Sequence, residues 1–434
     1  MISEEHERLE ELPAGEAEPE EPRPGRRPWW RRKPVKRTFV WTHRWSAMVL
    51  GLALLVVTTS GVPLIYQEEI VQAQHSSAYE ESGGPRAVDH AEAYAAVQRH
   101  DAEFAPFAIY YLDGVYVADD FETRRVTVDP STGEILGDFN PGGGEGFVPW
   151  TMSLMLNIHV CGLTCPEYVG YQAWLTEPVP GTGWLGFEGE PVSWGLLVLG
   201  LTAVLLLFLG LSGIWLWWPG IKRWFVGVRI RWRKGRYARD YDLHQVAGMI
   251  AIPLLLLWAV TGMGYEFGFV ERAWYAVTPG ETPEVRSLES TESDEPDIGV
   301  AAAVAAAVKH RGETAPVSVD LPPEDDPLAT YGVWFQDGND PWGKAVYPGD
   351  YLVSVDRKTG ETMTTYGDFG SRAEELWSDW NFPLHSGWAF NPWVRIIWLV
   401  LGLVPLLLAV TGLSTWFFKR RLRKRRARRL AAAV

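Results

Sequence analysis

The stretch Trp41-Thr-His-Arg-Trp45 opens the first apolar run long enough to cross a membrane, and its histidine recurs two hundred residues later. His43 is followed by Gly61 at +18, and His244 is followed by Gly262 at +18. Eighteen residues make five helical turns, or roughly 27 Å of rise. We therefore expect each His and its Gly to lie on one helix face, at opposite sides of a bilayer.

Four apolar runs have the length of membrane spans: Phe39–Tyr66, Ser193–Trp218, Asp242–Gly268 and Trp393–Phe418. The charged residues within them all sit near run ends: Arg44, Asp242, Glu266 and Arg395. The centre of each run therefore carries no formal charge, as the cost of charge in hydrocarbon requires. The first run is too long for the apolar part of a signal peptide and lacks a small-residue cleavage pattern, so we expect it to be retained.

Charge divides the chain into two kinds of surface. Eight Lys and Arg lie in Arg23–Arg37, eight in Pro219–Tyr241 and nine in Lys419–Arg429. The segments Gln67–Val192 and Glu271–Pro392 are acidic, with 20 acidic against 4 basic residues and 22 against 8. The positive-inside rule then predicts a multi-pass protein of the cytoplasmic membrane with both termini in the cytoplasm. Basic residues beside spans favour anionic lipid as their partner, and we expect no nucleic acid.

The expected domains follow from these boundaries. A cytoplasmic tail covers 1–37 and is disordered over its Glu- and Pro-rich part, Met1–Gly25. Spans cover 38–66, 193–218, 242–268 and 393–418, and outer lobes cover 67–192 and 269–392. A basic loop covers 219–241, and a basic tail covers 419–434.

The two halves of the chain repeat one order of motifs. The first half holds His43, a turn motif at Val126–Glu134, His159 and Ser212-Gly213. The second half holds His244, a turn motif at Val353–Glu361, His385 and Thr411-Gly412. Corresponding positions lie 201, 227, 226 and 199 residues apart, which one insertion and one near-equal deletion explain. Each half is expected to be one span, one outer lobe and one span, an internal duplication.

Each outer lobe is predicted to be a small α+β unit. Helical spacing marks Ala87–His100 and Ile298–His310. Strand patterns occupy Phe107–Leu112, Val115–Ala118, Arg124–Asp129, Ala315–Asp320, Tyr331–Gln336 and Tyr351–Asp356. The shared Asp-x-x-Thr-Gly-Glu element is predicted to be a hairpin turn whose Gly supplies a positive φ. The fold class is therefore a four-helix membrane protein with two extracytoplasmic α+β lobes.

Cysteine occurs twice, at Cys161 and Cys165, on the outer side. Two cysteines are too few for an iron–sulfur cluster or a Cys-rich zinc site. An outer compartment permits a disulfide, although this spacing on a regular helix would strain it, so we expect a turn there. A structural disulfide and a redox pair both fit the sequence.

These motifs carry a resemblance to a known family. A strand ending in Val-Asp-x-x-Thr-Gly-Glu resembles the PepSY domain. The four-span arrangement resembles the PepSY-associated transmembrane family over roughly Thr38 to Phe418, with Trp-x-His-Arg-Trp, Asp-Leu-His-Gln-Val-Ala-Gly and Pro-Leu-His-Ser-Gly in place. Members with assigned activity are similar to membrane ferric-siderophore reductases that hold haem b through histidines. The segment Gly162–Pro191 departs from the repeat, because the second half has no counterpart.

Four of the nine histidines are candidate haem ligands. His6, His75, His90, His100 and His310 lie in the tail or on polar segments, where we expect a solvated surface role. His43, His244, His159 and His385 are paired by the repeat at membrane edges, and neutral imidazole is a common axial ligand of haem iron. We expect His43 and His244 to hold one haem at the cytoplasmic side, and His159 and His385 a second at the outer side. Arg44 is the candidate partner of a haem propionate.

Small residues share a helix face with the two inner histidines. They are Ala47, Gly51 and Gly61 in the first run and Gly248, Ala251, Ala259 and Gly262 in the third. Such a face is typical of close helix packing, and it also leaves room for a flat porphyrin. The spacing supports both interpretations.

The leading function is electron transfer across the membrane through two haems, reducing a ferric siderophore or another ferric chelate at the outer lobes. The loop 219–241 is too short for a flavin or nicotinamide domain, so electrons must come from a quinol or a separate cytoplasmic reductase. A haem-free membrane protein that regulates or senses peptidases is an alternative, because PepSY lobes also occur in protease propeptides. A quinol-linked cytochrome with another outer acceptor is a third. An absorbance spectrum separates the second hypothesis from the others.

Overall fold

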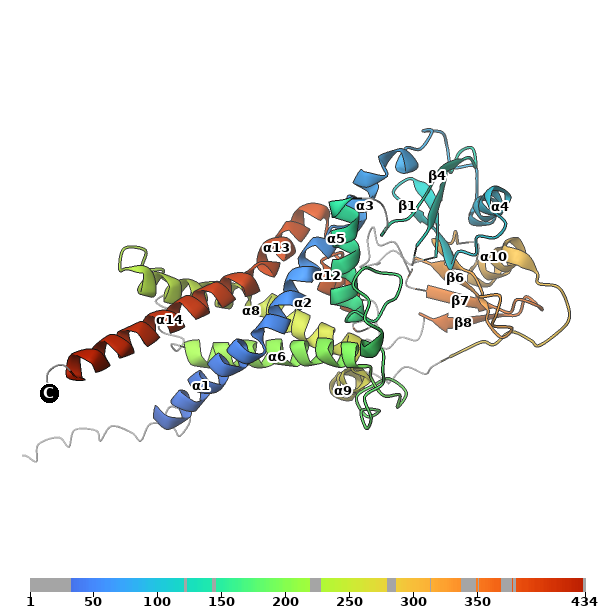
Figure 1. Cartoon of the computed structure of the whole chain (residues 1–434). Coiled ribbons are helices and arrows are strands. Elements are labelled where there is room, and N and C mark those ends of the chain that lie inside the picture. The colour runs from blue at the N-terminus through green and yellow to red at the C-terminus, as the bar shows by residue number, and fades with distance from the viewer. Residues whose placement is uncertain are drawn as a thin grey trace, which may run out of the picture.

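The computed structural model describes residues 33–431 apart from 121–122, 143–145, 219–227, 279–285, 313, 337–348, 350, 368–376 and 378–379. The disordered tail predicted at Met1–Gly25 and the first part of the basic loop, 219–227, lie outside the described residues. In the described part, helices form an elongated bundle, and a sheet with its covering helices sits beyond one end (Figure 1).

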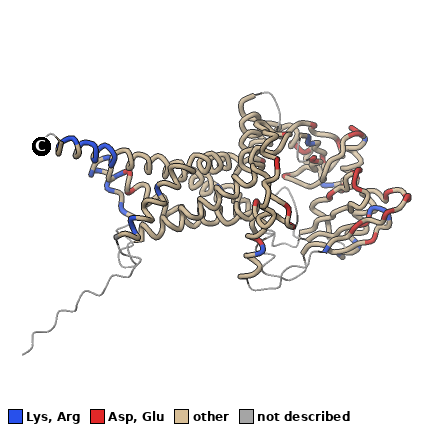
Figure 2. Tube along the Cα trace, turned by 60° about the horizontal axis from the view of Figure 1, so that its bottom comes forward, with Lys and Arg blue, Asp and Glu red and all other residues tan. Residues whose placement is uncertain are grey.

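Within the part of the chain that the structure describes, three helical segments are long and apolar enough to cross a membrane. They are α6 (Trp194–Trp217), α8 (Arg236–Glu266) and the run Pro392–Ala431, which consists of α13 (Pro392–Gly402) and α14 (Val404–Ala431). A bent pair, α1 (Lys33–Val49) and α2 (Gly51–Leu64), makes up to four if it counts as one span. Lys and Arg gather at the end of the bundle far from the sheet, and Asp and Glu are numerous around the sheet (Figure 2). The molecule therefore has an apolar middle between a basic and an acidic end.

The first apolar run does not form one straight helix. α1 and α2 meet at Leu50 with a bend of 65°. Gly51 follows the break and would meet no atom within 4 Å if it carried a Cβ, and Gly is a common site of helix kinks. The prediction that His43 and Gly61 share one helix face is therefore wrong, while His244 and Gly262 do lie on one continuous helix, α8.

In the described residues, the two acidic segments share a single antiparallel sheet of eight strands in the order β4-β3-β2-β1-β5-β6-β7-β8. Its strands are β1 (Ala108–Leu112), β2 (Val115–Asp119), β3 (Arg125–Val128), β4 (Ile135–Phe139), β5 (Ser318–Asp320), β6 (Tyr331–Phe335), β7 (Tyr351–Val355) and β8 (Thr362–Tyr366). The six predicted strands are present, with β5 shorter than expected, and β4 and β8 are additional edge strands. The two segments are therefore not separate lobes, because β1 pairs with β5 through Ala108–Asp320, Ile109–Val319 and Tyr110–Ser318.

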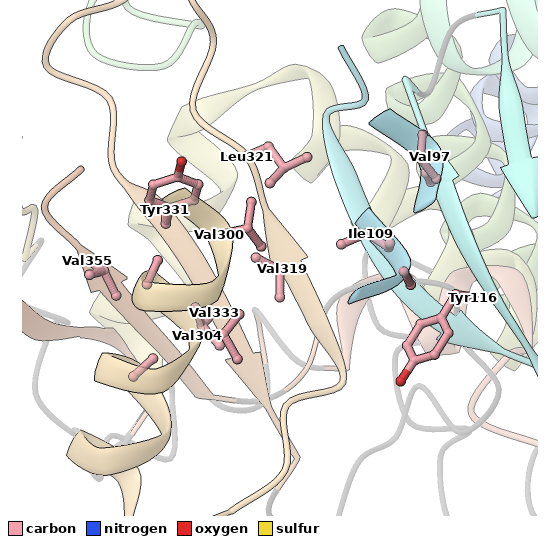
Figure 3. Packing of buried hydrophobic residues seen from close by; sticks show 14 of the residues in the cluster. Val97, Ile109, Tyr116, Val300, Val304, Val319, Leu321, Tyr331, Val333 and Val355 are labelled. Carbon is pink, nitrogen blue, oxygen red and sulfur yellow. The ribbon is translucent and has the colours of Figure 1, made fainter. Parts of the chain in front are cut away.

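One face of this sheet is covered by the two predicted helices, α4 (His90–His100) and α10 (Gly299–Arg311). Both insert small and β-branched side chains between themselves and the strands, and a single core runs across the β1–β5 junction (Figure 3). Val97 and Ile109 from the first half and Val304 and Val319 from the second belong to that core. Burial on this scale stabilises the fold by about 25 cal/mol per Å² of apolar surface.

His90 begins α4 and is buried, with 1% of its surface exposed, so its predicted surface role is wrong. Its Nε2 lies 3.2 Å from the carbonyl oxygen of Val317, which precedes β5. The ring also packs edge-on against Tyr116 of β2. His90 therefore fastens the first half of the sheet to the second.

The predicted hairpin turns are confirmed in both halves. Gly133 and Gly360 have φ of 72° and 73°, and each amide donates a hydrogen bond to the carbonyl of the turn aspartate, Asp129 or Asp356. Each aspartate carboxylate also accepts hydrogen bonds from backbone amides of the turn. The conformation requires glycine, because a side chain is strained at this φ.

Helix α3 (Gln67–Gln74) joins the bundle to the sheet through two adjacent glutamates. Glu68 accepts hydrogen bonds from buried Arg125 of β3 at 2.9 Å, and Arg125 also donates to Asp119 of β2 at 2.6 Å. Glu69 pairs with buried Arg395 of α13, whose guanidinium also donates to the carbonyl of Ile65 at 2.8 Å. These ion pairs fix the end of α2 nearest the sheet to both the sheet and α13.

A disulfide joins Cys161 to Cys165, with Cα atoms 5.7 Å apart. Cys161 ends a π-helical turn, Asn157–Cys161, that follows α5 (Phe147–Leu156), and Gly162 leaves it in the left-handed conformation. The predicted turn is therefore present. The fully buried Asn157 donates from Nδ2 to three carbonyls of the following loop, so the segment that carries His159 is held by covalent and polar contacts.

Candidate functional site

His159 and His385 come together at the end of the bundle nearest the sheet. His159 belongs to the π-helical turn after α5, and His385 belongs to α12 (Asn381–Ser386). Their ring centroids are 6.0 Å apart, with a tilt of 50° between the planes. Metal–imidazole bonds are about 2 Å long, so two imidazoles on opposite sides of one metal ion have ring centres about 6 Å apart. The observed separation matches that arrangement.

His43 and His244 lie at the other end of the bundle, on α1 and α8. They are near enough to influence each other electrostatically. Each end of the bundle therefore carries one histidine from each half of the chain.

Each of the four rings is anchored through Nδ1 to a neighbouring helix. His43 Nδ1 lies 2.7 Å from Ser212 Oγ of α6, and His385 Nδ1 lies 2.7 Å from Thr261 Oγ1 of α8. His159 Nδ1 lies 2.8 Å from the Val57 carbonyl of α2. His244 Nδ1 lies 3.0 Å from the Leu408 carbonyl and 3.2 Å from Thr411 Oγ1 of α14.

These contacts assign the proton on each ring. A carbonyl can only accept, so His159 and His244 must donate from Nδ1. The hydroxyl of Ser212 donates to the Leu209 carbonyl, and that of Thr261 donates to the Leu257 carbonyl. Each hydroxyl has one proton, so it accepts from the histidine Nδ1.

The remaining nitrogen, Nε2, is therefore the one with a free lone pair on all four rings. No hydrogen bond from these Nε2 atoms occurs within the described part of the chain. This tautomer is the one that metal-ligating histidines adopt, with the second nitrogen held by a carbonyl or hydroxyl. Three of the four other described histidines differ, because His90, His100 and His310 use Nε2 in hydrogen bonds, while His75 stacks on Phe139.

Every ring also lies against a glycine that follows a serine or threonine. A Cβ on Gly213 would lie 3.8 Å from His43 Cε1, and one on Gly412 would lie 3.4 Å from His244 Cε1. A Cβ on Gly262 would lie 3.9 Å from His385 Cε1, and one on Gly61 would lie 2.8 Å from His159 Nδ1. The preceding residues are Ser212, Thr411, Thr261 and Ser60. A Ser/Thr-Gly pair on α2, α6, α8 and α14 thus lies at each imidazole, and on α6, α8 and α14 its hydroxyl also contacts the histidine Nδ1.

The family model of the PepSY-associated TM region matches residues 40–419. The chain belongs to this family. The match confirms the resemblance drawn from the sequence motifs, and it includes all four histidines and the whole sheet. A search of the curated proteins found no match.

In this PepSY-associated protein the donor set fits a group held by two imidazoles and does not fit a bare metal ion. Among residues 33–431 that the structure describes, no group of three or more His, Cys, Asp or Glu side chains could hold a metal ion. A haem needs only two protein ligands, because the porphyrin supplies the other four nitrogens. Two facing imidazoles with free Nε2 atoms, each beside a glycine, are compatible with such a flat cofactor.

Arg44, the predicted propionate partner, lies next to His43 on α1 and is half-buried. It makes no ion pair with the described residues of this family member. The Nδ1 anchors Ser212, Thr261 and Thr411 were not identified as functional from the sequence. Their signal is the Ser/Thr-Gly pair, which recurs in each half of the chain.

Proposed function

We propose that the chain is a haem-containing transmembrane electron-transfer protein that reduces ferric siderophore or another ferric chelate on the outer side of the membrane. The observation that carries this proposal is the state of the four histidines. They form two pairs at opposite ends of an apolar bundle, with Nδ1 held as a donor and Nε2 left with a lone pair. A solvated or packing role does not by itself produce the same Nδ1 anchor and free Nε2 on four histidines.

The proposal includes four membrane spans, an internal duplication and cytoplasmic termini. The bent pair of α1 and α2 serves as the first span. The basic end of the bundle faces the cytoplasm, and the sheet lies outside, as the positive-inside rule directs (Figure 2). Two strand sets of the same order flank the β1–β5 junction, which supports the duplication.

His159 and His385 would hold one haem b at the outer side, and His43 and His244 would hold a second at the cytoplasmic side. Haem b supplies a one-electron carrier when it is bound. Ser212, Thr261, Thr411 and the carbonyls of Val57 and Leu408 orient the imidazoles and raise their basicity as ligands. Arg44, on the same helix as His43, would neutralise a propionate.

The proposed substrate is a ferric ion wrapped by hard oxygen ligands. One electron converts Fe³⁺ to Fe²⁺, which such ligands bind less tightly, so the iron is released. The electron donor is a quinol or a separate cytoplasmic reductase. Reduction on the acidic outer side requires that electrons cross the apolar bundle, and the two histidine pairs mark the two ends of that path.

The experiment that tests the proposal is an absorbance spectrum of the detergent-purified chain from haem-replete cells. We expect a six-coordinate low-spin haem spectrum with about two haems per chain. His385→Ala should remove one haem, whereas His310→Ala, in the same outer region, should remove none. A colourless protein would instead favour a haem-free membrane protein that regulates or senses peptidases.

A further inference from the structure

Glu266 is a largely buried residue whose carboxyl group has no hydrogen-bond or ion-pair partner among the described residues. Nine Asp, Glu and Arg residues are buried in the described chain, and eight of them make hydrogen bonds or ion pairs. Glu266 is the exception, because it makes neither within the described residues, although only 8% of its surface is exposed. Burial of an unpaired carboxylate is costly, and ionisable residues at membrane depth are functional by default.

The position of Glu266 relates it to the outer histidine pair. Glu266 is the last residue of α8, one helical turn beyond Gly262 and on the same face. A Cβ on Gly262 would lie 3.9 Å from His385 Cε1, and Thr261 of the same helix anchors that imidazole. Glu266 therefore lies one turn outward of the outer pair.

The surroundings of Glu266 are apolar. Its neighbours along α8 and α9 (Gly268–Val277), including Met263, Phe267 and Val270, belong to one buried hydrophobic cluster. The nearby ionisable groups are otherwise engaged or neutral. Tyr265 packs edge-on against His385, while Glu271 accepts a hydrogen bond from Tyr275.

The cation nearest in sequence is also engaged elsewhere. Arg272 of α9 donates to the Trp184 carbonyl at 3.0 Å. The histidines His159 and His385 hold their Nδ1 protons on Val57 and Thr261. No described cation is therefore available to stabilise a carboxylate at Glu266, and a negative charge there depends on the charge of the outer pair.

We propose that Glu266 takes up the proton that accompanies each electron arriving at the outer histidine pair. This inference rests on the proposed function. Each arriving electron makes the outer site one unit more negative, and one proton from the outer solution binds the Glu266 carboxylate, so the net charge of this apolar region is unchanged. When the electron passes to the ferric chelate, the proton returns to the outer solution. Within the protein, only the O–H bond of Glu266 forms and breaks, and the solvent supplies and takes back the proton.

The test is a redox titration of the full-length protein, followed by haem absorbance at pH 6, 7 and 8. The outer component is assigned as the one missing in His385→Ala. Its midpoint potential in the wild type should fall by up to about 59 mV per pH unit, the value for one proton per electron. Glu266→Gln should abolish this slope and leave the inner component unchanged. The control Glu271→Gln, on the adjoining helix, should behave as the wild type.

A slope that persists in Glu266→Gln, with both haems present, overturns this inference and leaves the proposed function standing. A colourless wild type overturns both. If the Gln variant does not assemble, the reduced-minus-oxidised infrared spectrum of the wild type decides. A protonated carboxyl band that appears on reduction and is displaced in Glu266→Asp supports the inference, and its absence contradicts it.

Discussion

Replacing Gly61 by alanine should disturb the outer histidine pair, whereas the equivalent change at Gly262 should not. A Cβ on Gly61 would lie 2.8 Å from both nitrogens of the His159 ring, and ordinary contacts begin at 3.4 Å. A Cβ on Gly262 would have ordinary contacts, 3.6 Å from Ala203 Cβ and 3.9 Å from His385 Cε1. The two variants make the same chemical change on opposite sides of one site.

The magnitude for Gly61→Ala follows from the displacement. The His159 ring must recede by about 0.6–1 Å, which carries Nδ1 beyond the usual hydrogen-bond range of about 2.7–3.2 Å from the Val57 carbonyl. Loss of such an anchor typically lowers metal affinity about 10–100-fold, or about 1.4–2.8 kcal/mol. We therefore expect the outer haem to bind about 10–100 times more weakly, with the inner haem unaffected.

The loss of haem affinity is measured as the haem-to-protein ratio during haem titration of each purified variant. Thermal unfolding of the same samples shows whether the variant destabilises the whole protein. Gly262→Ala is the matched control, and Gly262→Leu, which is too large for the site, should again weaken the outer haem alone. Wild-type occupancy of both haems in Gly61→Ala would refute the close packing of His159 on α2. Equal loss of both haems would show that the glycine serves helix packing rather than the imidazole.

Further predictions concern the anchors, the pairing and the turn. Ser212→Ala and Thr261→Val remove the Nδ1 acceptors of His43 and His385, so each should lower the haem affinity of one site about 10–100-fold, measured by haem titration; an effect on the opposite site would contradict the assignment. His43→Ala and His244→Ala should each remove the same haem, seen as half the wild-type haem content in the single variants and no further loss in the double variant. Burial by itself would raise the pKa of Asp356, but hydrogen bonds from Thr291, Lys358 and Thr359 lower it below the usual carboxyl value. The ionised carboxylate therefore stabilises the sheet at any pH above the usual carboxyl pKa. This contribution is lost as the pH falls through the lowered pKa of the folded state. Asp356→Asn should therefore cost about 1.5–3 kcal/mol of unfolding free energy at neutral pH, and the difference from wild type in denaturant titrations should shrink in acid.

The apolar helices were predictable from the sequence because a span needs a long uncharged run, and the ends of α6 fall within one residue of the prediction. The bend at Leu50 was not predictable from hydropathy, since both α1 and α2 contribute to one continuous apolar run. The pairing of β1 with β5 was equally hidden, because strand patterns do not specify partners far apart in the sequence. The turn glycines Gly133 and Gly360 were predictable, since their conformation depends on local chemistry alone.

The four histidines of the candidate site were predictable from the sequence, but the groups that hold their Nδ1 atoms were not. The repeat singles out His159 and His385 without any knowledge of distance. The role of Thr261 depends on how far α12 lies from α8, which no local pattern encodes. Glu266 is conspicuous only once its neighbours are known, because an acidic residue at the end of an apolar run is ordinarily solvated.

The junction of β1 and β5 has a consequence for synthesis of the chain. The two strands are separated by about 200 residues, and three residue pairs close the sheet between them. At a synthesis rate of about 5–20 residues per second, β5 emerges from the ribosome roughly 10–40 s after β1. During that interval Ala108–Leu112 has an unpaired strand edge, which is a template for pairing with another chain. Correct assembly therefore requires that the edge of β1 pairs with no other chain until β5 has been synthesised.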